Sequence, residues 1–182
     1  KAAFSHTRAL AGADAVYSAA FRRAGVLQVD GLDALLDAAL VLAPRQDTPA
    51  GSLTILTNGG GAGVLAVDAL SRAGGALTQL SPATQAALRA LMPASGACGN
   101  PVDILGDAGP GLYRGALDAL LAAPEVEAVL TINCPTAVAD SGQAAEAVIA
   151  AVAAQASPKP VLAAWLGEAS VATARAVLGA AR

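Results

Sequence analysis

The stretch Leu53-Thr54-Ile55-Leu56-Thr57-Asn58-Gly59-Gly60-Gly61-Ala62-Gly63-Val64-Leu65-Ala66 decides the fold. Residues 53–57 are apolar and partly β-branched, which predicts a strand covered on both faces. The glycines that follow permit a sharp turn, and the apolar run from Val64 predicts a helix that begins near residue 63. We therefore expect a strand, a glycine loop and a helix in direct succession.

The glycine loop is a candidate anion site. The first N–H groups of a helix have no acceptor within the helix, and the helix dipole adds positive potential there. The loop and the start of the helix can therefore hold a phosphate. The candidate phosphate-binding residues are Asn58, Gly59, Gly60, Gly61, Ala62 and Gly63. The alternative is a loop whose glycines only let the strand and the helix pack closely.

Two common phosphate motifs fit this loop poorly. Residues 61–66 match the GxGxxA form of the dinucleotide fingerprint, which also needs an acidic residue about 20 residues later to bind the ribose. The next expected strand, 76–80, is followed by Ser81 and offers no carboxylate there. A P-loop is excluded because no Gly-Lys-Ser/Thr follows the glycines.

The composition excludes several classes of protein. Of the 182 residues, 55% are hydrophobic and 14% are charged, and much of the apolar fraction is alanine. No uninterrupted apolar run approaches the roughly 18 residues of a membrane span. The net charge of −3 argues against nucleic-acid binding. The two cysteines, Cys98 and Cys134, suit packed, reduced thiols in a cytoplasmic protein and have no metal-ligand spacing.

Strands and helices alternate after residue 51. We expect strands at 53–57, 76–80, 128–132 and 161–165, and helices at 63–73, 82–91, 111–122, 142–155 and 168–181. This alternation predicts an α/β fold with a flavodoxin-like parallel sheet, and we expect a fifth strand beyond residue 182. Ligands of such sheets bind at the carboxyl ends of the strands. We expect the loops at 58–63, 81, 133–140 and 166–168 to meet there.

The first 44 residues are too few to bury a core of their own. A loop with His6 precedes expected helices at 13–24 and 32–43 and a short strand at 26–29. We interpret residues 1–44 as the C-terminal part of a second domain, joined by a linker at 45–51 to the domain at 52–182. The two helices should then expose apolar faces, which are compatible with a homodimer.

His6 is the single histidine of the chain. A lone histidine is usually a surface or capping residue. A neutral imidazole, which is available near neutral pH, can also attack phosphorus as a nucleophile.

Three segments carry a resemblance to a known family. Ser5-His6-Thr7-Arg8-Ala9-Leu10-Ala11-Gly12, continuing through Tyr17 and Phe21, resembles the phosphohistidine segment of NDP-forming acyl-CoA synthetases, the relatives of succinyl-CoA synthetase. Residues 57–66 and Gly99-Asn100-Pro101-Val102-Asp103-Ile104 are similar to two further segments of that family. Arg8 stands where the family has glycine, and it could strain the loop or pair with a phosphate.

The resemblance implies a phosphohistidine relay. His6 would carry a phosphoryl group between an acyl phosphate and a nucleoside diphosphate, which interconverts acyl-CoA, phosphate and ADP with acid, CoA and ATP. Residues 58–63 would form one of two helix N-termini that steady the phosphohistidine. ATP or ADP with Mg²⁺, and CoA, would be bound outside this chain, by an ATP-grasp domain and a CoA-binding domain in cis or on a partner subunit. We expect residues 1–182 alone to lack ligase activity.

Two other functions are kept open. Some family members are fused to a GNAT protein-lysine acetyltransferase domain, and the same module there resembles a non-catalytic acyl-CoA or nucleotide sensor. A flavodoxin-like binding domain with no synthetase role is the second alternative. The segment 99–103 also has a structural interpretation, because Asn-Pro forms turns and Asp103 can cap or orient one.

Overall fold

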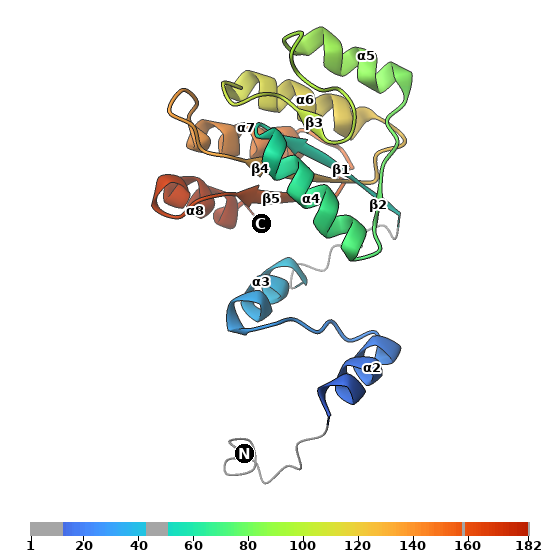
Figure 1. Cartoon of the computed structure of the whole chain (residues 1–182). Coiled ribbons are helices and arrows are strands. Elements are labelled where there is room, and N and C mark those ends of the chain that lie inside the picture. Colours follow the sequence, from blue (N-terminus) through green and yellow to red (C-terminus); the bar gives the residue numbers. More distant parts are fainter. Residues whose placement is uncertain (1–12, 43–50, 158, 182) are drawn as a thin grey trace. The chain divides into compact units, whose positions relative to one another are not determined.

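The computed structural model describes residues 13–42, 51–157 and 159–181 (Figure 1). The chain divides into two compact units, Lys1–Arg45 (unit 1) and Gln46–Arg182 (unit 2). The predicted histidine loop with His6, and all of the expected linker except Gly51, lie outside the described residues.

Unit 1 contributes two helices, α2 (Asp14–Ala24) and α3 (Leu32–Leu42). Gly25 ends α2 in the left-handed conformation, with φ 68°. Its N–H donates to the carbonyl of Arg22, and the N–H of Val26 donates to that of Phe21. The strand expected at 26–29 is wrong, because a strand needs a neighbour to pair with and the described part of unit 1 provides none.

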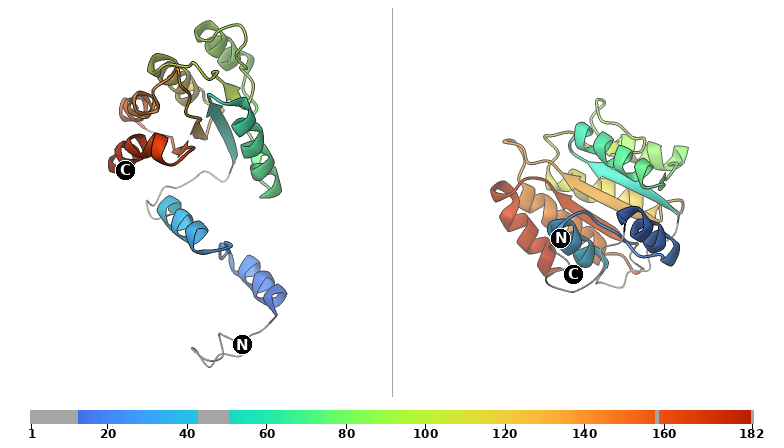
Figure 2. Two further views of the ribbon diagram at one scale, coloured as in Figure 1. Left: turned by 60° about the vertical axis from the view of Figure 1, so that its left-hand side comes forward. Right: turned by 60° about the horizontal axis from the view of Figure 1, so that its bottom comes forward.

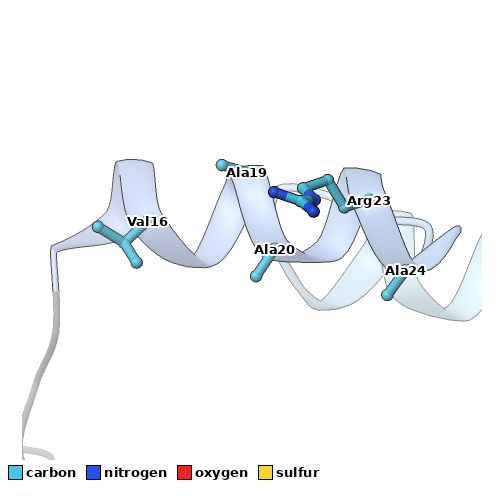
Figure 3. Close-up of a pocket in the computed structure, with 5 residues that line it drawn as sticks. All are labelled: Val16, Ala19, Ala20, Arg23 and Ala24. Atoms are coloured by element: carbon cyan, nitrogen blue, oxygen red, sulfur yellow. The ribbon is translucent and has the colours of Figure 1, made fainter.

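Both helices of unit 1 expose apolar side chains. Leu32 on α3 is 69% exposed, and α2 has no buried residue. Figure 3 shows Val16, Ala19, Ala20, Arg23 and Ala24 along α2, where they line an open hollow that belongs to this single helix. Such a hollow, bordered by one helix, is an unpacked helix face and has no features of a ligand site.

Unit 2 contains one parallel five-stranded sheet. Its strands are β1 (Ser52–Thr57), β2 (Ala76–Leu77), β3 (Val102–Asp103), β4 (Ala128–Asn133) and β5 (Val161–Trp165). The order is β2-β1-β4-β5, and β3 also pairs with β1. The predicted parallel α/β sheet is confirmed. Two details differ: β2 has only two residues, and an additional strand, β3, forms in a segment that we expected to be a loop. The strand expected beyond residue 182 lies outside the chain and stays a prediction.

The short strands β2 and β3 share one edge of β1. β2 pairs with Ser52 and Leu53, whereas β3 pairs with Leu56 and Thr57. Asn100 joins these segments: its Oδ1 accepts the N–H of Ile55 at 2.9 Å, and its Nδ2 donates to the carbonyls of Leu53 and Thr78 at 2.9 and 3.0 Å. The Asn-Pro segment therefore has a structural role where β2 leaves the sheet.

The helices of unit 2 cover the two faces of the sheet unequally. They are α4 (Gly60–Arg72), α5 (Pro82–Leu91), α6 (Pro110–Ala122), α7 (Ser141–Ala153), a 3₁₀ turn (Ala169–Val171) and α8 (Ala172–Ala180). Figure 2 (left) shows α4 on one face and α6, α7 and α8 side by side on the other. The single helix expected at 168–181 is divided into the 3₁₀ turn and α8. The helix expected from residue 63 begins earlier, at Gly60.

The buried core lies between the sheet and the row α6–α8. Leu56 of β1, Val129 of β4 and Leu117 of α6 are completely buried within it. On the opposite face, β4 and β5 place Leu130 beside Leu162, and both leucines are only half-buried. Within the described ranges, no helix combines the length and apolar character needed to cross a lipid bilayer.

Candidate functional site

The carboxyl ends of β1 and β4 are joined by the side chain of Asn58. Its Nδ2 donates to the carbonyl of Cys134 at 2.9 Å, and its Oδ1 accepts the N–H of Cys134 at 2.7 Å. Asn58 is only 3% exposed. Both functional groups of the amide are therefore engaged in holding the two loops together, and an anion at this loop would meet backbone groups instead.

The first turn of α4 leaves its backbone donors open. Gly59 is the N-cap, with an extended backbone and no side-chain cap. Its own N–H donates to Thr57 Oγ1 at 3.0 Å. Among the described residues, the N–H groups of Gly60, Gly61 and Ala62 have no hydrogen-bond acceptor. These three donors, with the positive end of the helix dipole, lie at the carboxyl end of β1.

Close packing accounts for several of the glycines. A Cβ on Gly59 would lie 2.5 Å from the sulfur of Cys134, and one on Gly60 would lie 2.7 Å from Asp103 Oδ2. A Cβ on Gly63 would lie 3.0 Å from a methyl of Thr57. A Cβ on Gly61 would meet nothing within 4 Å. The packing explanation therefore covers residues 59, 60 and 63, and it does not cover Gly61, which borders open space.

Asp103 orients the turn after β3. Its Oδ1 accepts the N–H of Leu105 at 2.9 Å, and Leu105 has the unusual φ of 70°. The other carboxylate oxygen lies beside Gly60, where a negative charge favours the start of a helix. The structural interpretation of this residue is thereby supported.

Cys134 is a poor nucleophile in this setting. Burial raises the pKa of its thiol above the ordinary value, and the charge of Asp103 raises it further. Because the thiolate is the reactive form, the thiol is held in its inert state near neutral pH. Cys98 is buried and Cys134 is half-buried, and both thiols are unpaired.

A second polar network secures the end of β4, and the sequence analysis missed it. Asn133 Nδ2 donates to the hydroxyl of Tyr113 at 2.9 Å, and Ser141 Oγ donates to Asn133 Oδ1 at 2.7 Å. The indole N–H of Trp165 donates to the carbonyl of Ser141 at 2.9 Å. Burial raises the pKa of Tyr113, which therefore stays protonated as a structural donor. The available signal was an asparagine at the end of each central strand, at positions 58 and 133.

An open hollow lies near this network, between the loop after β4 and the start of α8. Its border includes the hydroxyl-bearing residues Thr136, Ser141, Ser170 and Thr173. No group of three or more metal-ligating side chains occurs in the part of the chain that the structure describes.

The loop at Ser81 lies at the opposite end of the strands from the one predicted. We expected Ser81 at the carboxyl ends of the strands, but its N–H donates to Glu125 Oε1 at 2.8 Å. Glu125 precedes β4, so Ser81 lies near the amino end of that strand. The error follows from the length of β2, which ends at Leu77 and does not carry the chain across the sheet.

Comparison with known proteins identifies the family. The family model of the Ligase-CoA domain matches residues 53–180. The chain belongs to the Ligase-CoA domain family. A second family model, the succinyl-CoA ligase like flavodoxin domain, matches residues 1–42. The resemblance drawn from the three sequence segments is confirmed.

Two proteins with similar sequences are ADP-forming ligases. The chain is 44% identical to acetate–CoA ligase [ADP-forming] I of Archaeoglobus fulgidus, over 82% of this chain and 22% of that protein. It is 39% identical to the alpha subunit of acetate–CoA ligase [ADP-forming] I of Pyrococcus furiosus, over 92% of this chain and 36% of that subunit. The chain thus spans about a fifth to a third of the length of these relatives.

A solved structure shares the fold. It is the dinucleotide forming acetyl-coenzyme A synthetase 1 of Ca. Korarchaeum cryptofilum, in complex with phosphate and ADP. The TM-score is 0.87 at 31% identity, and the match covers 97% of this chain and 38% of that one. Together with the parallel sheet described above, this match confirms the flavodoxin-like α/β fold.

Proposed function

We propose that this chain is part of an ADP-forming acyl-CoA synthetase. Such an enzyme interconverts acyl-CoA, phosphate and ADP with the free acid, CoA and ATP. The names of the Archaeoglobus and Pyrococcus relatives support this assignment. The chemistry proceeds through an acyl phosphate, whose phosphoryl group passes to a histidine and then to ADP.

The observation that carries the proposal is the open first turn of α4. A phosphorylated imidazole brings concentrated negative charge, and the transfer of its phosphoryl group depends on positioning and charge neutralisation. The N–H groups of Gly60, Gly61 and Ala62, which have no acceptor among the described residues, offer both. A helix N-terminus stabilises such a charge by up to about 2 kcal/mol in a partly buried geometry.

The roles of the remaining parts follow from the family. We assign the phosphoryl carrier to His6 and phosphate binding to residues 58–63, through backbone groups. We assign residues 1–44 to the end of a ligase domain, 45–51 to a linker and 52–182 to the flavodoxin-like ligase domain. ATP or ADP with Mg²⁺, and CoA, are bound by an ATP-grasp domain and a CoA-binding domain elsewhere in the enzyme.

The test is phosphohistidine formation in the full-length enzyme. Incubation with γ-labelled ATP and Mg²⁺ should give an acid-labile, base-stable phosphoprotein, and the label should be lost in His6→Ala. Arg8→Gly is the matched variant, because it changes the same loop toward the family pattern and should retain the label. An unlabelled wild-type enzyme that still binds nucleotide would refute the relay.

A further inference from the structure

The side chain of Asp103 leaves one acceptor oxygen beside the first turn of α4. Its Oδ1 accepts the N–H of Leu105 at 2.9 Å and so orients the turn after β3. Its Oδ2 lies next to Gly60, where a Cβ on the glycine would approach it to 2.7 Å. Within the described ranges, no donor is bonded to Oδ2, and the residue is half-buried. One oxygen of the carboxylate therefore has a structural role, and the other is free to meet a ligand.

Free donors and a free acceptor thus lie side by side. The first three N–H groups of α4 have no acceptor among the described residues, so Asp103 does not accept from them. A capping carboxylate would do so, as Asp140 does at the start of α7 by accepting two backbone N–H groups. Asp103 is therefore placed beside the donors of α4 without occupying them. This pattern is complementary to a group that both accepts and donates hydrogen bonds.

The loops at this end of the sheet supply no basic side chain. The strands β1, β3, β4 and β5 are followed by loops at 58–59, 104–109, 134–140 and 166–168. None of these segments contains lysine or arginine, whereas three acidic residues occur in them. What these loops offer an anion is therefore backbone donors, and net positive charge alone does not account for recognition here.

We propose that Asp103 makes the first turn of α4 selective for a phosphate that carries a proton. This inference rests on the proposed function, which takes this turn as a phosphate site. Hydrogen phosphate presents oxygen acceptors to the N–H groups of α4 and an O–H that donates to Oδ2 of Asp103, a charge-assisted hydrogen bond. Sulfate has the same charge and shape but no proton near neutral pH. Its oxygens would face the carboxylate unpaired, and a site built to bind an O–H rejects an analogue that lacks it.

The first experiment compares anions in the full-length wild-type enzyme. ATP formation from acyl-CoA, ADP and phosphate is measured with sulfate as a competitor of phosphate. We expect the inhibition constant of sulfate to exceed the KM for phosphate at least about tenfold, as for the loss of a hydrogen bond to a charged group. Monofluorophosphate has the charge of hydrogen phosphate but also lacks the proton, and it should bind as weakly as sulfate. Equal binding of either anion and phosphate would overturn the proposal.

The second experiment repeats the comparison in two variants. Asp103→Asn keeps an acceptor for Leu105 but replaces the free acceptor by an amide donor, which suits sulfate. The preference for phosphate over sulfate should therefore fall at least about tenfold. Asp107→Asn is the matched control, because it removes the same charge from an exposed residue of the same loop and should keep the preference. A preference that is lost in both variants, or retained in both, would overturn the role of Asp103.

The phosphohistidine assay separates this inference from the proposed function. An enzyme that forms phosphohistidine but does not distinguish phosphate from sulfate would refute only the role of Asp103. An enzyme that binds nucleotide but forms no phosphohistidine would refute the relay, and this inference with it.

Discussion

The helices α4 and α5 begin in opposite ways. At α5, Ser81 accepts the N–H of Thr84 through its side chain, Pro82 occupies the first turn, and Glu125 accepts from both Ser81 and Thr84. At α4, the cap is Gly59, which has no side-chain oxygen, and three N–H groups have no acceptor among the described residues. Within the part of the chain that the structure describes, one helix start is therefore completed by side chains and the other is open.

The capped start of α5 contributes to stability, whereas the open start of α4 is available to a ligand. A side-chain cap is worth about 1 kcal/mol, so a helix without one forgoes that stabilisation. The open start of α4 lies at the carboxyl ends of the strands, where ligands of parallel sheets bind. The capped start of α5 lies near their amino ends. Each prediction below changes one of the two helix starts, or the loop beside it.

The largest effect is expected at Gly61. Gly61→Pro removes one N–H from the first turn of α4, where proline is tolerated, and its side chain enters open space. In the full-length enzyme we expect the rate of histidine phosphorylation to fall about a hundredfold, as when one donor to a developing charge is removed. Gly61→Ala adds a side chain but keeps the N–H, and it should phosphorylate normally. Equal rates in the two variants would contradict a role for this donor.

The next effect is expected at Asn58. Asn58→Ala removes two hydrogen bonds of 2.9 and 2.7 Å to the backbone of Cys134 and leaves that backbone unsatisfied. We expect the free energy of unfolding to fall by about 2 kcal/mol, as measured by urea denaturation. A change below about 0.5 kcal/mol, the usual range for neutral surface substitutions, would show that the two loops are held by other contacts.

A smaller loss is expected at the capped helix. Ser81→Ala removes the acceptor for Thr84 N–H, which lies at 3.2 Å, and should lower the free energy of unfolding by about 1 kcal/mol. Histidine phosphorylation in the full-length enzyme should not change, because Ser81 lies near the amino ends of the strands and the open helix start lies at their carboxyl ends. Reduced phosphorylation with unchanged stability would reverse the assignment of the two ends.

The smallest effect concerns the pH dependence of Glu125. Hydrogen bonds from Thr84 and from the backbone of Ser81 lower its pKa from 4.5 to about 2. Because the pKa of this carboxylate is lower in the folded state than in the unfolded state, its ionised form stabilises the fold at pH values above 4.5. This contribution is lost as the pH falls from 4.5 towards 2. The melting temperature of wild type should therefore exceed that of Glu125→Gln near neutral pH. The two should converge in acid, and a constant difference would refute the mechanism.

Long apolar segments made most of the sheet predictable. The strands β1, β4 and β5 were expected to within one residue, because buried parallel strands read as continuous apolar runs. β3 was missed because a strand of two residues beside Pro101 leaves no periodic signal. The start of α4 at Gly60 was missed because glycine disfavours helices, and here packing against Cys134 and Asp103 outweighs that preference.

The candidate site was predictable only in part. The position of the glycine loop at the end of a central strand follows from the order of strands and helices. The role of the Asn58 side chain does not, because its partner Cys134 is 76 residues away in the chain. The network of Tyr113, Asn133 and Ser141 is equally non-local, and only the fold brings these residues together. The assignments of His6 and of the phosphate-binding residues remain predictions.

The single tryptophan provides an optical reporter for this end of the molecule. Trp165 is 4% exposed, and its indole N–H donates to the carbonyl of Ser141, in the first turn of α7. The emission of an indole depends on its hydrogen bond and on the access of water. A ligand that moves the loop after β4 should therefore shift the fluorescence of the unlabelled protein, so that binding can be followed in a stopped-flow instrument without any added dye.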